Sequence, residues 1–454
     1  MRTFVSVSAM ASAMRTSNGP ARTLLGVCAA AAVLTACSSA GSPRGFGAPT
    51  IASNPEASVS THLSTFGVHY RLITLPPLSG DGSHANSIND RGWIAGDSTI
   101  RQSSESNAAL WIDSHAIDVG TLGGASCVCW PVKTNRSELA ATSQTKQSDP
   151  LGEDFCSSVW STSLVCRGFR WRGGTIKLLP TLGGNNDQAA GENDKGQIVG
   201  VAETARRDRG CALPQVLHYN ATIWQADGKA VALRPFSGDA VSQAIAINNR
   251  GDVVGASGAC GPPYVPGYGS THALIWRNGL PADLGNLGGT TVNAAFAIND
   301  RGDIAGASTL SDNITIHAFF WRRGVMTDLG TLAGDVESIA LGLNNDGSVV
   351  GISCDASGNC RGFVWKDQSM SDLNHVVAHA PSQFIINGQD INDRGWIVGQ
   401  VYNGQSGQSV AYVAVPHDND ASHFYAQDVA RTILPETFRI QVVRRTTFRP
   451  YLNQ

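Results

Sequence analysis

Eight of the ten cysteines in this chain are spaced in ways that permit covalent or metal chemistry. The other two, Cys28 and Cys37, lie in an N-terminal apolar stretch; the eight that remain are Cys127, Cys129, Cys156, Cys166, Cys211, Cys260, Cys354 and Cys360. An even number of cysteines in an exported chain is typical of disulfide bonds. A zinc site is the alternative for a Cys-x-Cys with further cysteines nearby, but no histidine spacing supports it, and we predict no metal.

The spacing favours particular disulfide partners. We predict two pairs that each close one loop and one pair that joins neighbouring loops, namely Cys354–Cys360, Cys156–Cys166 and Cys211–Cys260. Cys127 and Cys129 are too close along a strand to pair with each other. We therefore also consider a cross-paired cluster in which they share partners with Cys156 and Cys166.

Other residues that could do chemistry recur once per repeat, which favours an architectural role. An aspartate returns at one register, and a single carboxylate per repeat is typical of a turn or cap residue: Asp118, Asp283, Asp328 and Asp372. His272 and His317 recur in the same way. Asn-Asp-x-Gly loosely resembles a calcium loop but lacks its ligand spacing and terminal Glu. With no nucleophile elbow, zinc-protease or phosphate-loop motif, we predict no catalytic residue and no cofactor.

The elements that position these residues are internal repeats. The repeated phrase consists of an apolar residue, Asn or Asp, a polar residue, Gly, two apolar residues and a final Gly. Its first copy begins at Ile88-Asn89-Asp90-Arg91-Gly92. Five further copies and one worn copy follow, with the central Gly or Ser at Gly92, Ser137, Gly196, Gly251, Gly302, Gly347 and Gly395. An apolar segment, ending in Trp in all but the last repeat, and an Asp-Leu-Gly phrase accompany them. A fixed period of this length indicates a solenoid, propeller or array.

Each period divides into four short strands, so the fold class predicted is all-β. In the fifth period the strands are expected at 293–298, 303–308, 317–321 and 325–329, with Asn-Asp-x-Gly as a tight hairpin turn. Four strands in about 50 residues is the size of a propeller blade. We predict a seven-bladed β-propeller over residues 63–416, closed by an N-terminal strand near Tyr70 that completes the last blade. An open β-solenoid is the alternative.

The repeated phrases resemble the bacterial extracellular HAF repeat family. The match is clearest in His317-Ala318-Phe319 followed by Asp328-Leu329-Gly330, and it weakens in the second period. The resemblance implies an exported, propeller-like repeat protein. It implies no enzymatic activity.

The N-terminus carries a secretory signal over residues 1–36, with an apolar run too short to span a membrane. It ends in Leu34-Thr35-Ala36-Cys37, which resembles the lipobox of bacterial lipoproteins and implies lipidation of Cys37. Ser38 resembles the residue that directs lipoproteins to the outer membrane. We predict a flexible tether at 37–62 and a basic, non-repeat tail at 417–454, which is a helix and strand, a docking segment or a poorly ordered end.

Function is expected where the repeats vary. In an up-and-down sheet the tight turns share one face and the variable loops the other, and loops on a rigid scaffold carry binding residues. Arg and Tyr anchor interfaces, so we predict a binding face at Arg206, Arg207, Arg209, His218, Tyr219, Tyr264 and Tyr268. Solvated arginines and tyrosines packed on loop prolines are the alternative.

Three hypotheses follow. The first is a monomeric, membrane-anchored scaffold that binds a protein or glycan. The second is a propeller hydrolase or lyase with its site at the central channel. It is weak because the strand starts are mostly Ala, Asn, Ser and Gln, with Asp187 and Glu337 as exceptions. The third is an outer-membrane assembly lipoprotein. A net charge of −3 gives no basic excess for nucleic acid.

Overall fold

The structure is a computed structural model that describes residues 69–100, 105–129, 133–156, 162–264, 269–417 and Leu434. The described residues belong to one compact unit, His62–Gln454. The signal peptide, Cys37 and the tether lie outside them, as does the tail apart from His417 and Leu434. No helix in the described part of the chain is long and apolar enough to cross a membrane.

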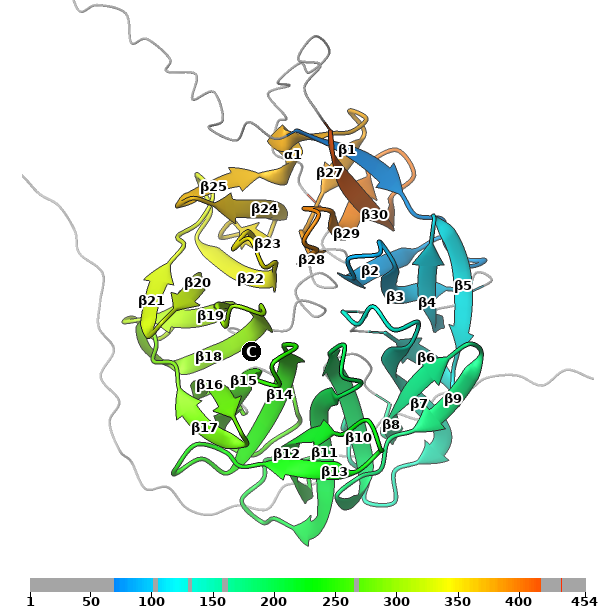
Figure 1. Ribbon diagram of the computed structural model, residues 1–454, viewed down its shortest axis with the longest axis vertical. Coiled ribbons are helices and arrows are strands. Elements are labelled where there is room, and N and C mark those ends of the chain that lie inside the picture. The colour runs from blue at the N-terminus through cyan, green and yellow to red at the C-terminus, as the bar shows by residue number, and fades with distance from the viewer. Residues whose placement is uncertain are drawn as a thin grey trace, which may run out of the picture. The chain divides into compact units, whose positions relative to one another are not determined.

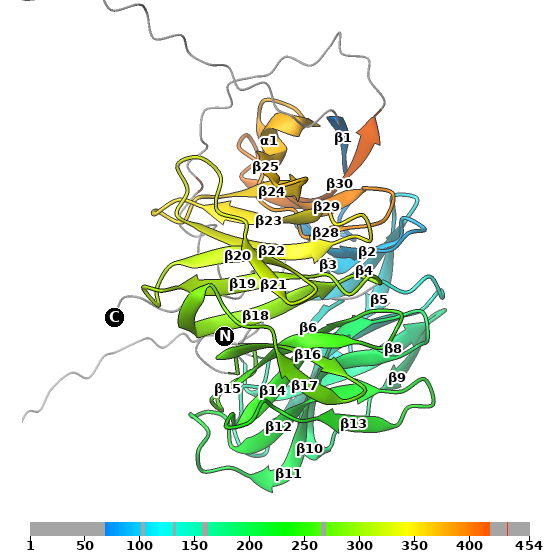
Figure 2. The ribbon, with the colours of Figure 1, turned by 60° about the vertical axis from the view of Figure 1, so that its left-hand side comes forward.

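The described chain is almost entirely β, as predicted, and its strands are arranged radially (Figures 1 and 2). The elements are β1 (His69–Thr74), β2 (Ser83–Ile88), β3 (Ile94–Thr99), β4 (Ser106–Ile112), β5 (His115–Gly120), β6 (Gly123–Val128), β7 (Leu139–Ser148), β8 (Leu164–Arg172), β9 (Thr175–Leu178), β10 (Gly183–Glu192), β11 (Ile198–Arg207), β12 (Leu217–Trp224), β13 (Ala230–Leu233), β14 (Val241–Ile247), β15 (Val253–Gly258), β16 (His272–Arg277), β17 (Leu280–Asp283), β18 (Gly288–Ile298), β19 (Ile304–Leu310), β20 (Ile316–Arg322), β21 (Val325–Asp328), β22 (Glu337–Leu343), β23 (Val349–Cys354), β24 (Cys360–Lys366), β25 (Ser369–Asp372), α1 (Leu373–Val376), β26 (Val377–Ala378), β27 (Gln383–Ile385), β28 (Asp390–Ile391), β29 (Ile397–Asn403) and β30 (Gln408–His417).

Four-stranded antiparallel sheets are the recurring unit. Each of β10–β13, β14–β17, β18–β21 and β22–β25 forms one sheet in chain order. Two further four-stranded groups, β2–β5 and β6–β9, are linked into an eight-stranded sheet by a bridge between Ser106 and Ser126. The last sheet runs β26-β1-β30-β29-β27, with β28 also on β29. In it β1 pairs antiparallel with β30, from His69–His417 to Thr74–Tyr412, so the first and last strands share one sheet.

The first strand of each group lies innermost and carries a bulge in five of the groups described. One extra residue interrupts its pairing with the second strand: Asn86, Ala190, Ile245, Phe296 and Leu341. A bulge bends the strand and redirects a side chain. The last Gly of the repeated phrase permits it, because a Cβ at Gly255 would overlap the carbonyl oxygen of Gln243. The worn second copy has Ala141 there, and its inner strand leaves the pairing early.

The Asn-Asp-x-Gly phrase forms the predicted hairpin turn and also joins neighbouring sheets. Within a turn, Asn299 Oδ1 accepts the backbone N–H groups of Arg301 and Asp303. Its Nδ2 then donates to the backbone oxygen of Asn344 in the next sheet, at 3.0 Å. The same bond recurs from Asn89 to Thr134, Asn193 to Asn248, Asn248 to Asn299, Asn344 to Asn392 and Asn392 to Asn89. Six such bonds therefore connect turns that are far apart in the sequence.

Residues at the second position of the turn make a parallel set of bonds. Asn249 N donates to Asp300 Oδ1, and Asp300 N donates to Asn345 Oδ1, each at 2.8 Å. The set continues through Asn345, Asp393 and Asp90. Outside the worn second copy, neighbouring sheets are thus joined through both turn positions. We name the face that carries these turns the turn face. The opposite face carries the loops between second and third strands, and we name it the loop face.

The inter-sheet bond can be tested at Asn299. We expect Asn299→Asp to lower the free energy of unfolding by about 2–4 kcal/mol, because the substitution keeps the two accepted bonds and replaces the donor with a buried oxygen facing the Asn344 carbonyl. Thermal and denaturant unfolding measure the loss. The matched control is Asn286→Asp, an exposed residue whose Oδ1 only accepts Gly288 N, and it should change stability by less than about 0.5 kcal/mol. Equal effects of the two substitutions would contradict this account.

Candidate functional site

A cavity of about 240 Å³ lies among the inner strands. Its apolar wall contains the bulged residues Ile245, Phe296 and Leu341, all of them half-buried. The cavity also contacts polar side chains, including Asn86, Gln188, Gln389, Lys133 and Asp390. The bulges that distort the inner strands therefore place an apolar surface and a hydrogen-bonding surface around one space.

An ion pair from two distant repeats is part of this lining. Lys133 Nζ lies 2.6 Å from Asp390 Oδ1 and donates to the Ile391 carbonyl at 3.2 Å. Asp390 Oδ2 accepts the backbone N–H of Ile88 at 2.9 Å. Burial raises the pKa of Asp390, while Lys133 opposes that rise. The pair fixes the position of the Lys133 ammonium, which is part-exposed, beside the cavity.

Glu192 is a further charged residue among the residues that line the cavity. It stands where the other regular copies of the phrase have Ile or Leu, and its side chain is buried. Its Oε1 has no hydrogen-bond partner within the described part of the structure. Burial, and then the neighbouring Glu138 carboxylate, hold the pKa of Glu192 well above its usual range.

These charged residues were missed by the sequence analysis. Unusual residues were expected at the starts of the inner strands, at Asp187 and Glu337. These charges instead lie one or two residues before the turn position that is occupied by Thr134, Asn193 or Asn392. The signal was present as a departure from the phrase. Lys133 and Glu192 replace its apolar residue, and Asp390 precedes it where the other regular copies have Ser, Gly or Ala.

The predicted arginines lie on the loop face: Arg206 and Arg207 end β11, and Arg209 lies in the connection between β11 and β12. Arg206, Arg207 and Arg209 are exposed, and Arg206 pairs with Asp208 at 3.0 Å. This agrees with a solvated loop and leaves three guanidinium groups accessible. His218 is buried, with its Nδ1 3.0 Å from the Tyr219 carbonyl, and burial lowers the pKa of this imidazole.

The predicted tyrosines do not form a surface patch with these arginines. Tyr219 is fully buried and packs edge-on against Phe155, with ring centroids 5.8 Å apart, so its proposed role as a surface contact is wrong. The reason is that β12 turns this side chain into the interior beneath the loops. Tyr264 lines the cavity instead, and its hydroxyl donates to the Ala244 carbonyl at 2.8 Å. Tyr268 lies outside the described residues.

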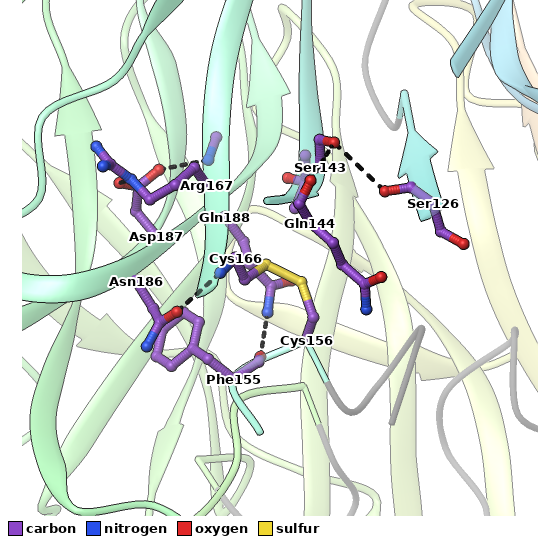
Figure 3. The surroundings of a disulfide bond; sticks show 12 residues. Ser126, Ser143, Gln144, Phe155, Cys156, Cys166, Arg167, Asn186, Asp187 and Gln188 are labelled. Atoms are coloured by element: carbon purple, nitrogen blue, oxygen red, sulfur yellow. Dashed lines mark hydrogen bonds and ion pairs between the residues drawn. A yellow bond between two sulfur atoms is a disulfide. The ribbon is translucent and has the colours of Figure 1, made fainter. Parts of the chain in front are cut away.

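Three of the predicted disulfides are present: Cys156–Cys166, Cys211–Cys260 and Cys354–Cys360. Figure 3 shows Cys156–Cys166 beside the inner strand β10. There the Gln188 amide donates to the Phe155 carbonyl, and Asn186 Oδ1 accepts Cys166 N at 2.8 Å. The disulfide therefore holds a loop against a residue that lines the cavity.

The prediction of disulfide bonds for Cys127 and Cys129 is wrong, because both are buried free thiols. The physical reason is position. The two residues stand two apart along β6 and just beyond it, on one face, and both pack into an apolar cluster with Leu139 and Phe169. Cys156 and Cys166, their expected partners, are bonded to each other.

The recurrent aspartates are turn residues, as predicted. Asp118, Asp283 and Asp328 each accept a backbone N–H from the glycine two residues later. Within the described ranges no group of three or more His, Cys, Asp or Glu side chains is placed to hold a metal ion.

Buried carboxylates lie beneath the loops that the Cys156–Cys166 and Cys211–Cys260 disulfides hold. Glu153 Oε1 accepts the N–H groups of Val216 and Leu217 at 2.7 and 2.6 Å, so it fixes the connection between β11 and β12. The Gln215 amide donates both to Glu153 Oε1 and to Glu203 Oε1, at 3.0 and 2.9 Å. Burial, and then the Glu153 charge, raise the pKa of Glu203 to about 8. Burial also raises the pKa of Glu153.

Comparison with known proteins gives distant structural neighbours and no sequence relative. No family model matches it, and neither does any curated protein. It is similar to a puromycin hydrolase at 12% identity and a TM-score of 0.46, over 73% of this chain and 53% of that one. It is similar to virginiamycin B lyase from Staphylococcus aureus at 10% identity and a TM-score of 0.45, over 76% of this chain and 99% of that one. TolB from Acinetobacter baumannii gives 9% and 0.36, over 78% and 97%.

The chain spans about half the length of the puromycin hydrolase. These likenesses all have TM-scores below 0.5. At such identities and TM-scores we draw nothing about activity from them.

The buried carboxylate pair predicts a pH dependence of stability. A carboxyl group whose folded pKa is raised stabilises the fold below its unfolded pKa, and that stability is lost as the pH rises through the folded pKa. We therefore expect ionisation of Glu203 to lower the melting temperature as the pH rises from about 4.5 to about 8. Glu153→Gln keeps the three bonds at Oε1, places an amide at the unpartnered Oε2 and removes the charge that raises the pKa of Glu203.

Between pH 5 and pH 8 the melting temperature of Glu153→Gln should fall by roughly 2–5 °C less than that of the natural chain, as thermal unfolding measures. Asp208→Asn is the control, since this carboxylate lies in the connection between β11 and β12, pairs with exposed Arg206 and should leave the slope unchanged. An unchanged slope in Glu153→Gln would show that the two carboxyl groups do not interact.

Proposed function

We propose that this chain is an exported, lipid-anchored scaffold whose sheets form a closed seven-bladed β-propeller, and that it binds a small amphipathic ligand in the central cavity. Closure is supported by the pairing of β1 with β30 and by the bond from Asn392 to Asn89. Export and outer-membrane anchoring through Cys37 follow from the lipobox-like sequence, and the three disulfides fit an oxidising compartment. Membership of the HAF repeat family is part of the same proposal.

One observation carries the binding proposal: the cavity has two chemically different walls. The bulged side chains of Ile245, Phe296 and Leu341 offer apolar contact, which is the main source of affinity in small-molecule sites. Asn86, Gln389 and the Lys133–Asp390 pair offer hydrogen bonds that orient a ligand. The ligand class that fits is a molecule or chain segment with one apolar group and several hydrogen-bonding groups.

The structure changes where binding is proposed. With Tyr219 buried and Tyr264 in the cavity, the loop face offers Arg206, Arg207 and Arg209 as contacts for a protein or glycan partner. We treat that contact as secondary, because exposed arginines with one ion pair are typical of a solvated loop.

A hydrolase or lyase is the second candidate, favoured by the Lys133–Asp390 pair beside the cavity. The two functions differ in what Lys133→Met would do. In an enzyme that uses this ammonium the substitution removes turnover and leaves ligand binding within a few fold. In a binding scaffold the substitution weakens ligand binding. Mass spectrometry then shows an unchanged ligand after incubation with the natural chain and with Lys133→Met.

The cavity can be tested with the neutral fluorescent probe N-phenyl-1-naphthylamine. We expect saturable binding to the full chain and at least a roughly tenfold weaker affinity for Ile245→Trp, because the larger ring fills the space beside Phe296. Fluorescence titration measures both. Val325→Trp is the matched control, since Val325 is 65% exposed on the outer strand β21, and its affinity should equal that of the natural chain. Equal affinities for all three proteins would refute a cavity site.

A further inference from the structure

Leu434 is the one residue after His417 that the structure describes, and its side chain is fully buried. It belongs to an apolar cluster with Ile339, Phe384, Tyr402 and the Cys354–Cys360 disulfide. Its backbone N–H donates to Asn359 Oδ1 at 3.2 Å. A residue from the non-repeat tail is therefore held both by packing and by a main-chain hydrogen bond.

The cluster around Leu434 lies toward the loop face. Its members come from the early parts of the inner strands β18, β22 and β27 and from the late parts of β19, β23 and β29. Asn359 lies in the loop that the Cys354–Cys360 disulfide closes, and its own N–H and amide groups are bonded to Asp355. The disulfide loop thus presents a fixed acceptor to a segment that packs on the cluster. We name this surface the tail pocket.

The tail begins on the face opposite this pocket. The strand β30 runs from the loop face to the turn face and ends at His417. The described residues His417 and Leu434 therefore lie toward opposite faces, with 16 residues between them in the sequence. Sixteen residues span at most about 53–58 Å, whereas the ten residues of β30 cover about 33 Å. The connection is long enough, so the contact of Leu434 does not require any change in β30.

The chemistry of the pocket defines what it accepts. A branched aliphatic side chain fills the apolar cluster, and a backbone N–H pairs with the Asn359 side chain. Apolar side-chain burial combined with a main-chain hydrogen bond is the way extended peptides are recognised. A single anchor of this kind binds weakly between molecules, but a covalent tether raises its effective concentration to about the millimolar range.

We propose that the tail pocket is a docking site for an extended peptide with a leucine anchor, and that the C-terminal segment of this chain occupies it through Leu434. The proposal does not depend on ligand binding in the cavity. It defines an intramolecular contact that a peptide from another protein would have to displace.

The test uses a fluorescent peptide with the sequence of residues 428–440 and the full-length chain. Natural protein should bind the peptide weakly, because its own segment competes. Full-length Leu434→Asp should bind it at least about tenfold more tightly, since its own anchor no longer fits the apolar cluster. The same peptide carrying Leu434→Asp should bind neither protein. Leu213→Asp, a substitution at a residue 82% exposed, is the control and should behave as the natural chain does.

Trypsin provides a second measurement that does not need the peptide. Arg431 and Arg439 flank Leu434, and we expect cleavage at both to be at least about tenfold faster in Leu434→Asp than in the natural chain. Leu434→Ala serves as a milder variant if the Asp protein loses its β-sheet circular dichroism. Equal cleavage in all variants, or equal peptide binding by the natural chain and Leu434→Asp, would overturn the proposal.

Discussion

The side-chain amide of the turn asparagine is the interaction on which the rest of the structure depends. Its oxygen closes one turn and its nitrogen reaches the backbone of the next sheet, as Asn248 does toward Asn299. A sheet of four strands cannot bury both of its faces alone, so each needs a neighbour in a defined position. The amide sets that position where the inner strands end. Asp in its place would close the turn equally well but could not donate to the neighbour.

The position at which this amide is missing is also where the charged cavity residues gather. In the worn second copy Thr134 replaces the asparagine. Its backbone N–H donates to the Glu192 carboxylate, and its carbonyl accepts from Asn89 Nδ2. The link onward is made by Asp194, which accepts the N–H of Asn135 at 2.6 Å. Beside this altered turn Lys133 crosses to Asp390 in the last sheet. Loss of the regular bond is thus compensated by ionic contacts, and those contacts give the cavity a polar wall.

The elements of this fold were largely predictable because they are set by local patterns. The expected strand at 303–308 is observed as β19, Ile304–Leu310, and 317–321 as β20, Ile316–Arg322, with their turns in place. Alternation, turn glycines and disulfide loops are all readable over a few residues. Which side chains face a neighbouring sheet is not local. That is why Tyr219 was expected at the surface, Cys127 in a disulfide and Lys133 in no site at all.

The same distinction explains why the repeated phrase gave an incomplete picture of function. Regular turns mark the scaffold, so binding residues were expected in the variable loops on the opposite face. The loops that are described there hold buried carboxylates, disulfides and the contact of Leu434, so much of their variation is used in packing. Phe296 and Leu341 line the cavity and also pack against the cluster that receives Leu434. Because these two side chains contact both the cavity and the tail pocket, a change of packing in the tail pocket would alter the cavity wall. The bulges of the inner strands therefore connect the two faces of the scaffold.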